Sequence, residues 1–333
     1  MRIGRHMPTG SQPVRALQTA RAIGCEAVQI FVTNPRGWRE PEAHPAQETA
    51  FRAATAQLHI SPVVVHATYL INLASPRDDF AEQSVRLLRA TLARAERFGA
   101  ASVVLHIGSH GGAGEAAGLV RLAEGIRRTL EGDQPGPLLL LENDVGAGNE
   151  LGYRFENLAA VLDAVPEHAA RLGVCLDTAH LWGAGFDIGT AAGVDQTLDD
   201  AARLIGLARV HVLHLNDTRF ALGSHRDVHA RLGEGIIGTE GLQTLLRHPG
   251  LAHASVLLET PIAETAPGHA DWPHDQAHLR RVYALAGRKP PRRAKLVAPD
   301  VAGQDERAQR GDGATPATSR ARRTEHKALA TAE

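Results

Sequence analysis

The stretch "SVVLHIGSHGGAGEAAGLVRLAEGIRRTLEG", residues 102–132, contains the pattern on which most of the chain is built. It opens with a short apolar run of β-branched character, 102–106, which is typical of a buried strand. A glycine-rich connection follows, and it lacks the GxxxxGK[ST] pattern of a phosphate-binding loop. The rest has apolar residues at helical spacing. The stretch therefore predicts a strand, a loop and a helix, which together form one βα unit.

The same alternation recurs along the body of the chain. The predicted strands are "RIGRH" (2–6), "AVQIF" (27–31), "PVVVH" (62–66), "SVVLH" (102–106), "PLLLLE" (137–142), "LGVCLD" (172–177), "RVHVLH" (209–214) and "ASVLLE" (254–259). Segments of helical period, about eight of them, lie between these strands. Apolar strands in strict alternation with helices indicate a parallel sheet that helices cover. Eight such units predict a single (β/α)₈ TIM barrel, which we place at residues 1–286.

Composition narrows the class of protein further. The chain has 333 residues and no apolar window near the ~18 residues of a membrane span. Its first residues lack the apolar core of a secretory signal. Cys25 and Cys175 are the only cysteines, which argues against a disulfide framework or a cysteine-based zinc site and favours a reducing, cytoplasmic location.

The C-terminal segment 287–333 differs from the body in charge and in composition. It carries eleven Lys+Arg against six Asp+Glu, so the whole-chain totals leave the body acidic. The segment is rich in Pro, Ala and Gly with almost no large apolar residues, which predicts a disordered basic tail. A role in solubility and a loose attraction to a polyanion are equally compatible with this composition.

Six consecutive predicted strands end on a histidine or a carboxylate. These residues are His66, His106, Glu142, Asp177, His214 and Glu259. A lone histidine at a strand end is usually structural, but in a barrel all these ends converge on one face. Carboxylates gathered there would repel one another, and no Lys or Arg ends any of these strands. Metal cations are the economical answer, and His/carboxylate donors without Cys suit zinc or manganese.

Three more candidate ligands lie close in sequence to this set. His180 follows Asp177 by three residues, and Asp227 and His229 stand two apart in "HRDVHARLGEG" (225–235), so they point the same way in an extended segment. Nine ligands are too many for one or two ions with open positions and suit three. The other loop histidines, His110, His225, His253 and those in "WPHDQAH" (272–278), are predicted to be solvated.

At this point the chain resembles endonuclease IV, the family 2 apurinic/apyrimidinic endonucleases, across residues 1–285. The resemblance rests on stretches that occur together and in order. They are "FVTNPRGWR" (31–39), "HATYLINL" (66–73), "LHIGSH" (105–110), "LENDVGAGNELG" (141–152), "GVCLDTAH" (173–180), "HLND" (214–217), "RDVHARLGEGIIG" (226–238) and "LLET" (257–260).

The resemblance implies three Zn²⁺ ions in the barrel, with Mn²⁺ as an alternative at one site. Carried over by position, one ion would be held by His66, His106 and Glu142; a second by Glu142, Asp177, His214 and Glu259; and a third by His180, Asp227 and His229. Val228 and Ala230 stand where the family motif carries Arg and His, which leaves fine DNA contacts or substrate preference open.

The resemblance also implies an activity in base excision repair. The expected reaction is hydrolysis of the phosphodiester 5′ to an abasic site in double-stranded DNA, which leaves 3′-hydroxyl and 5′-deoxyribose phosphate ends. Glu142, as a bridging ligand, would orient the hydroxide, and Arg36, Tyr69 and Leu70 would enter the duplex at the lesion. We expect a monomer that associates with the nucleoid.

Two other functions fit part of this pattern. A metal-dependent sugar isomerase or epimerase shares the barrel and a similar His/carboxylate rim, but it needs only one or two metals. A non-catalytic DNA-lesion binder with structural zinc is the other alternative. Metal content and cleavage of a duplex with one abasic analogue separate the three.

Overall fold

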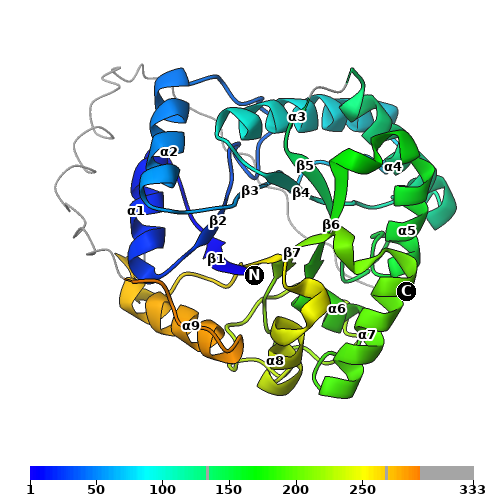
Figure 1. The fold of residues 1–333 in the computed structure, drawn as a ribbon. Coiled ribbons are helices and arrows are strands. Elements are labelled where there is room, and N and C mark those ends of the chain that lie inside the picture. Colours follow the sequence, from blue (N-terminus) through cyan, green and yellow to red (C-terminus); the bar gives the residue numbers. More distant parts are fainter. Residues whose placement is uncertain (133–134, 267–268, 293–333) are drawn as a thin grey trace, which may run out of the picture. The chain divides into compact units, whose positions relative to one another are not determined.

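The computed structural model describes residues 1–132, 135–266 and 269–292. Eight parallel strands form a closed barrel in sequence order, and the last strand pairs with the first. Figure 1 looks into this barrel and shows the helices arranged around it. The predicted (β/α)₈ barrel is therefore confirmed.

The strand bounds match the predicted runs to within one residue at either end. They are β1 Arg2–His6, β2 Ala27–Ile30, β3 Val63–His66, β4 Ser102–His106, β5 Leu138–Glu142, β6 Leu172–Asp177, β7 Val210–His214 and β8 Ser255–Leu258. Glu259, which we expected to end the last strand, is the first residue beyond it.

The described residues contain nine α-helices and three 3-10 helices. The α-helices are α1 Pro13–Ile23, α2 Pro45–Gln57, α3 Asp78–Arg97, α4 Glu115–Leu130, α5 Phe155–Ala164, α6 Thr178–Ala184, α7 Ala191–Leu204, α8 Thr239–Arg247 and α9 Trp272–Leu285. The 3-10 helices are η1 Pro166–Arg171, η2 Leu207–Arg209 and η3 Pro249–Leu251, and β9 Glu264–Ala266 pairs with β10 His269–Ala270. Eight of these α-helices alternate with the strands, and the ninth is the short α6, which precedes α7 between β6 and β7. None of these helices combines the length and the apolar character needed to cross a membrane.

The outer helices follow from their apolar spacing, as α3 illustrates. Val85, Leu88 and Leu92 are buried at intervals of three and four residues, so they lie on one face of the helix. Asp78 lies in the first turn and Arg97 in the last, where each charge complements the helix dipole. The buried face packs into the main core between helices and barrel.

The barrel interior is filled by a small apolar layer. Its residues are Ala27, Val64, Val104, Leu140, Cys175, Val212 and Leu257. Side chains two apart in a strand point to the same side of the sheet. The residue two positions after each member of this layer therefore also points into the barrel, one layer closer to the carboxyl ends of the strands. These residues are Gln29, His66, His106, Glu142, Asp177, His214 and Glu259. The two-residue period of the strands thus directs six predicted ligands into one mouth.

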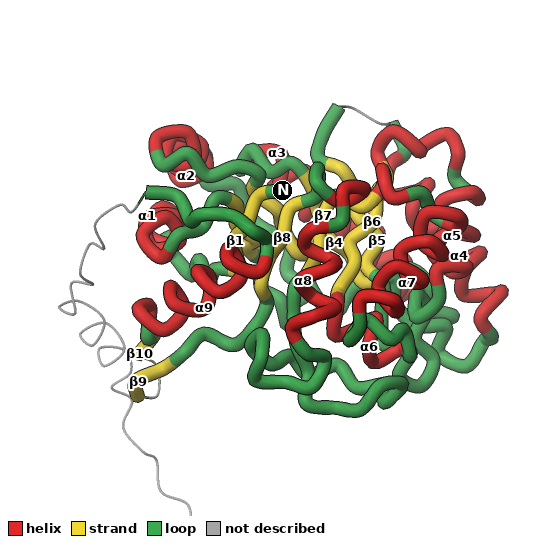
Figure 2. Tube along the Cα trace, turned by 60° about the horizontal axis from the view of Figure 1, so that its bottom comes forward, coloured by secondary structure: helices red, strands yellow, loops and turns green. Residues whose placement is uncertain are grey.

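Figure 2 shows the barrel from the side, with long loops gathered at the end of the strands opposite the chain's N-terminus. The longest connection in this region joins β7 to α8 and contains Asp227 and His229. The loop before α2 contains Arg36, and the loop before α3 contains Tyr69 and Leu70. The loops at this end therefore carry all the predicted site residues that do not lie on strands or on α6.

The chain leaves the barrel after α9. Arg288 pairs with the Glu26 carboxylate at 2.9 Å, and its backbone N–H donates to the Tyr283 carbonyl at 2.8 Å. The residues just after α9 are thus attached to the barrel. The rest of the predicted tail, 293–333, lies outside the described residues.

Candidate metal centre

Glu142 lies at the middle of the cluster of predicted ligands. Its Oε2 atom is 3.3 Å from His66 Nε2 and 3.5 Å from His106 Nε2, and its Oε1 atom is 2.6 Å from His214 Nδ1. The three histidines end β3, β4 and β7, and Glu142 is fully buried. His66, His106 and Glu142 have donor atoms within 4.8 Å of one another, so together they could hold a metal ion.

A second group shares Glu142 and lies across the barrel mouth. It consists of Glu142, Asp177, His214 and Glu259, whose donor atoms also lie within 4.8 Å of one another. His214 Nδ1 is 3.1 Å from Glu259 Oε2 and 3.9 Å from Asp177 Oδ2. The carboxylate of Glu142 therefore stands between the two groups, where a bridging ligand would lie.

The third group combines α6 with the long loop after β7. His180 Nε2 and His229 Nε2 lie 3.2 and 3.1 Å from the same atom, Oδ1 of Asp227. Asp177 caps α6, and its Oδ1 accepts a hydrogen bond from the His180 backbone N–H at 2.9 Å. This cap places His180 directly above the end of β6. The structure thus brings all nine predicted ligands to one end of the barrel.

Two observations show that this donor set suits metal ions. His180 Nε2 and His229 Nε2 are buried, and neither has a well-aligned hydrogen-bond partner within the described residues. Two imidazole nitrogens that face one carboxylate oxygen in this way match the His₂Asp donor sets that metal sites use. In addition, the four carboxylates among the predicted ligands form ion pairs only with histidines within the described residues, and none with Lys or Arg. These carboxylates are Glu142, Asp177, Asp227 and Glu259.

The opposite ring nitrogens of the histidines are held by neighbouring groups. His66 Nδ1 donates to the Ala67 carbonyl at 2.7 Å, and His180 Nδ1 donates to the Asn143 carbonyl at 2.8 Å. Because a carbonyl can only accept, these rings carry a proton on Nδ1, so Nε2 is the nitrogen that faces the centre and would bind an ion. Such contacts commonly orient metal-binding histidines.

The sequence reasoning missed some of the groups that orient the ligands. Asp144 Oδ2 lies 3.3 Å from His106 Nδ1, and the Gln29 side chain lies 2.9 Å from His214 Nε2. Gln29 could have been found, since it is two residues after the inward-facing Ala27. Asp144 follows the end of β5 in a loop whose path the residue pattern does not determine.

Burial and mutual charge shift the pKa values of this cluster. Burial alone would raise the pKa of Glu142, but the charges of His106 and His214 and its hydrogen bonds hold it well below the usual range. Burial lowers the pKa of His106, but Glu142 and Asp144 outweigh it and raise the pKa to about 9. The pKa of His180 is likewise raised well above its usual value, against burial, chiefly by Asp177 and Asp227. A divalent cation that binds these two histidines must displace their protons, so its binding competes with protonation.

The three predicted lesion-binding residues lie on two adjoining loops. The Thr68 hydroxyl donates to the Pro35 carbonyl at 2.6 Å, so the loop of Arg36 is linked to the loop of Tyr69 and Leu70. Arg36 is exposed and Leu70 is partly buried. Tyr69 is 58% exposed as a residue, although the centroid of its ring lies only 5.5 Å from that of His66. Tyr69 thus stands at the rim of the candidate metal centre and is partly open to solvent.

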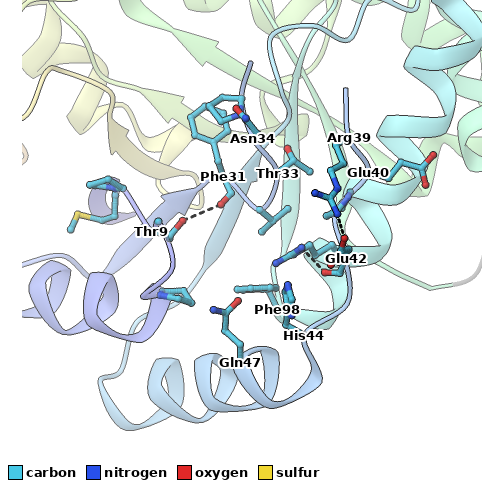
Figure 3. A pocket seen from close by; sticks show the side chains of 18 residues that line it. Thr9, Phe31, Thr33, Asn34, Arg39, Glu40, Glu42, His44, Gln47 and Phe98 are labelled. Atoms are coloured by element: carbon cyan, nitrogen blue, oxygen red, sulfur yellow. Dashed lines mark hydrogen bonds and ion pairs between the residues drawn. The ribbon is translucent and has the colours of Figure 1, made fainter. Parts of the chain in front are cut away.

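A separate cavity of about 570 Å³ lies beneath the loop before α2 (Figure 3). Its walls include Phe31, Thr33, Gln47 and Phe98, and none of the nine predicted ligands lines it. Phe31 separates this cavity from the metal centre, because its ring also packs against that of His66 at 5.6 Å. The cavity is a neighbour of the centre and not part of it.

The predicted loop around "WPHDQAH" is wrong, because His274 and His278 both lie on α9, and only His274 is exposed there. The sequence predicts a solvated loop for His278, in "WPHDQAH", but this residue lies on α9 and is 8% exposed. Its Nε2 accepts a hydrogen bond from the Leu232 backbone N–H at 3.0 Å, and burial lowers its pKa to about 4. The prediction of a solvated side chain failed because Leu232, in the long β7–α8 loop, packs its backbone against the imidazole.

The chain also matches known proteins. Residues 17–282 match the family model described as a xylose isomerase-like TIM barrel. The chain is 42% identical over 285 residues to "Probable endonuclease 4" of Chloroflexus aggregans, which covers 85% of this chain and 97% of that protein. It is 40% identical over 261 residues to the protein of the same description from Halothermothrix orenii, with 78% and 94% covered.

Among solved structures, endonuclease IV from Thermus thermophilus matches with a TM-score of 0.75 and 36% identity, covering 86% of this chain and 99% of that one. A D-tagatose 3-epimerase-like protein matches with a TM-score of 0.62 at 16% identity, a likeness that shows the shared fold alone. The resemblance seen in the sequence is confirmed by relatives that the chain spans almost from end to end. The chain belongs to the endonuclease IV family, and it is an enzyme of the phosphodiester-hydrolase, apurinic/apyrimidinic endonuclease type.

Proposed function

We propose that this chain is a metal-dependent DNA repair endonuclease that acts on abasic sites in double-stranded DNA. It hydrolyses the phosphodiester 5′ to the lesion and leaves a 3′-hydroxyl and a 5′-deoxyribose phosphate. It uses three zinc ions, with manganese as an alternative at one position. The proposal is supported by the names of its relatives and by the cluster of candidate ligands at the barrel mouth. Eight of the nine belong to groups that could hold an ion, and the ninth, Asp227, pairs with His180 and His229.

The observation that carries the proposal is the pair of buried nitrogens around Asp227. His180 Nε2 and His229 Nε2 lie within 3.2 Å of one carboxylate oxygen and lack aligned partners in the described residues. This outer group comes in addition to the two groups around Glu142. A centre with one or two ions, as in a sugar isomerase, has no use for it.

When bound, metal ions in such a centre activate water and neutralise charge on the attacking and leaving oxygens of an in-line displacement. Glu142 is ionised, since its pKa is held well below the usual range by His106, His214 and its hydrogen bonds despite burial. It therefore remains an acceptor that can orient a water molecule toward the phosphorus atom. The surrounding imidazoles fix the carboxylate and prevent it from rotating away.

Asp227 lies at the outer edge of the centre. Its side chain is 49% exposed, whereas those of His180 and Glu142 are buried. A nucleic-acid phosphate that approaches from solvent would therefore meet the Asp227 group before the Glu142 groups. By the resemblance to the family, the Asp227 group would hold the ion that offsets charge on the leaving oxygen, and the Glu142 groups would serve the attacking side.

Recognition of the lesion falls to the two linked loops at the rim. The Tyr69 ring is largely exposed and lies next to the rings of His66 and His106, with centroid distances of 5.5 and 6.0 Å. It is in a position to stack on a base beside the abasic nucleotide, while Arg36 and Leu70 fill the space of the missing base. Because Thr68 and Pro35 join the loops, these side chains act together.

The test uses a duplex with one abasic-site analogue, labelled at the 5′ end of the damaged strand. We expect a single cut immediately 5′ to the analogue, a product with a 3′-hydroxyl, and loss of cleavage in excess EDTA with recovery on addition of zinc. The same duplex without the analogue should stay intact. Failure to cut the damaged duplex with zinc present, or equal cleavage of both duplexes, contradicts the proposal.

A further inference from the structure

Asp217 is a fully buried carboxylate outside the nine predicted ligands, in the loop just after β7. It accepts four backbone hydrogen bonds from that same loop. Oδ1 accepts from Thr218 at 2.9 Å and Ile237 at 3.1 Å, and Oδ2 accepts from Gly233 at 2.9 Å and Gly235 at 3.2 Å. Hydrogen bonds to an ionised acceptor are roughly twice as strong as neutral ones. Asp217 thus ties the second half of the loop into a fixed turn.

The backbone of Asp217 extends this connection to the metal centre. Its N–H donates to the Ala230 carbonyl at 3.1 Å, and the Ala230 N–H donates to the Asp217 carbonyl at 2.6 Å. Ala230 is the residue next to His229 and only three after Asp227. The β-bridge between residues 217 and 230 therefore sets the height of both predicted ligands above the end of β7.

Two glycines of the loop allow the backbone to wrap around this carboxylate. A Cβ atom at Gly235 would lie 2.2 Å from Asp217 Oδ1, and Gly233 has a φ of +79°. The first position has no room for a side chain, and the second has a conformation that favours glycine. The turn "LGEG" (232–235) is thus built around Asp217.

The first half of the loop is fixed independently. The His225 N–H donates to the Gly183 carbonyl at 3.0 Å, and its Nδ1 donates to the Val145 carbonyl at 2.6 Å. The Gly223 N–H donates to the Trp182 carbonyl at 3.0 Å. The loop is therefore held at both ends, and the short span 226–229 between them carries Asp227 and His229.

We propose that Asp217 is a positioning residue that fixes Asp227 and His229 for the third metal. The inference rests on the proposed function, because it needs that metal. Asp217 belongs to none of the groups of described residues that could hold an ion. It acts through the backbone of the 230–237 segment. A neutral amide in its place would turn an NH₂ group toward two backbone donors and release one half of the turn.

The experiment measures zinc per chain and the affinity of each zinc for Asp217→Asn, with Asp163→Asn as a control on the exposed side of α5. We expect the parent and the control to hold three zincs. The Asp217→Asn variant should bind the third at least about tenfold more weakly and keep two at parental affinity. In a double variant with His229→Ala, Asp217→Asn should cause no further change in zinc affinity, because the two residues act on one site.

Gly235→Ala is a second variant that keeps the carboxylate, but its Cβ would lie 2.2 Å from Asp217 Oδ1 and 2.4 Å from the Thr218 carbonyl oxygen. It displaces the same turn around Asp217 and should reproduce the selective loss. This variant decides the matter if Asp217→Asn does not fold. Three zincs bound at parental affinity in both variants would overturn the proposal. So would loss of all zincs together with a lower melting temperature of the metal-free protein, because that result marks a general folding role. A parent that holds fewer than three zincs would instead contradict the proposed function itself, before any variant is compared.

Discussion

The Nε2 atom of His180 lies 3.2 Å from Oδ1 of Asp227, although the two residues belong to different parts of the architecture. His180 is buried on α6, where the Asp177 cap fixes it to the end of β6. Asp227 comes from the long loop after β7, and half of its side chain is exposed. The outer group of candidate ligands therefore combines a buried helix residue with residues of an exposed loop. Loops of this kind carry function with little effect on the stability of the fold.

His229→Ala should separate this outer group from the rest of the centre. The variant keeps two of three donors, which hold a zinc ion poorly, so we expect two zincs per chain in place of three. The melting temperature of the metal-free protein should change little, because His229 lies in a loop. Single-turnover cleavage of an abasic duplex should fall by about two to three orders of magnitude, the scale of losing one stabiliser of transition-state charge.

The matched control is His253→Ala, which removes an exposed imidazole whose only described ring partner is His211. It should behave like the parent in all three measurements. Retention of three zincs by the His229→Ala variant, or a parental rate with two, would show that the loop group is not the catalytic third site.

Truncation of Tyr69 or Arg36 should weaken lesion binding and leave the metals in place. Tyr69→Ala and Arg36→Ala should each weaken binding of an abasic duplex by about 1–3 kcal/mol, the range for loss of one stacking contact. Tyr69→Phe keeps the ring and should bind like the parent, and zinc content should stay at three in every variant. The measurement is the Kd from fluorescence anisotropy in EDTA-free buffer. Equal affinities across the series would make these residues part of loop packing only.

His278 should make the stability of the protein depend on pH. Burial lowers its pKa to about 4, from an ordinary value near 6.5, so between these values only the unfolded chain gains a proton. The free energy of unfolding should therefore fall as pH decreases from about 6.5 to about 4, with His278 contributing on the order of 1–3 kcal/mol. His278→Gln can still accept from the Leu232 N–H but does not titrate, so it should show a smaller loss. Urea unfolding at several pH values checks this, and identical pH slopes for both proteins would refute the role of His278.

The basic tail should affect DNA affinity and not the chemistry. A chain ending at Arg288 keeps the ion pair with Glu26 and removes ten Lys+Arg and six Asp+Glu. Because phosphate neutralisation releases counterions, its DNA affinity should depend less steeply on salt than that of the full chain. Single-turnover cleavage at saturating enzyme should be unchanged. A shortened chain that binds DNA like the parent but does not cut it would assign the tail a catalytic role instead.

The barrel and the positions of the inner candidate ligands could be predicted from the sequence because both follow from the two-residue period of strands. Val104 and His106, or Leu140 and Glu142, must share the inner side of the sheet once the strand is recognised. The convergence of these strand ends is then a property of every such barrel. Glu259 shows the limit of this argument, since it lies one residue beyond β8 and still reaches His214.

The contacts that depend on loop paths could not be predicted in the same way. Asp217 and His278 both hold the loop after β7, but one accepts four backbone N–H groups and the other accepts one from across the molecule. Neither contact leaves a period or a spacing in the sequence. In the sequence, Asp217 is only part of the family stretch "HLND", and His278 is predicted to lie in a solvated loop. Only the folded chain shows which backbone groups they bind.

The most direct test of the central claim is cleavage of an abasic duplex as zinc is returned to the metal-free protein in known equivalents. The account predicts little single-turnover cleavage until the inner positions are filled. The rate should then rise until about three zincs per chain are bound, because nine ligands, with Glu142 shared between two ions, suffice for three. The product should carry a 3′-hydroxyl throughout. A rate that is already maximal at one equivalent, or cleavage by the metal-free protein, would contradict a three-metal centre built from these nine residues.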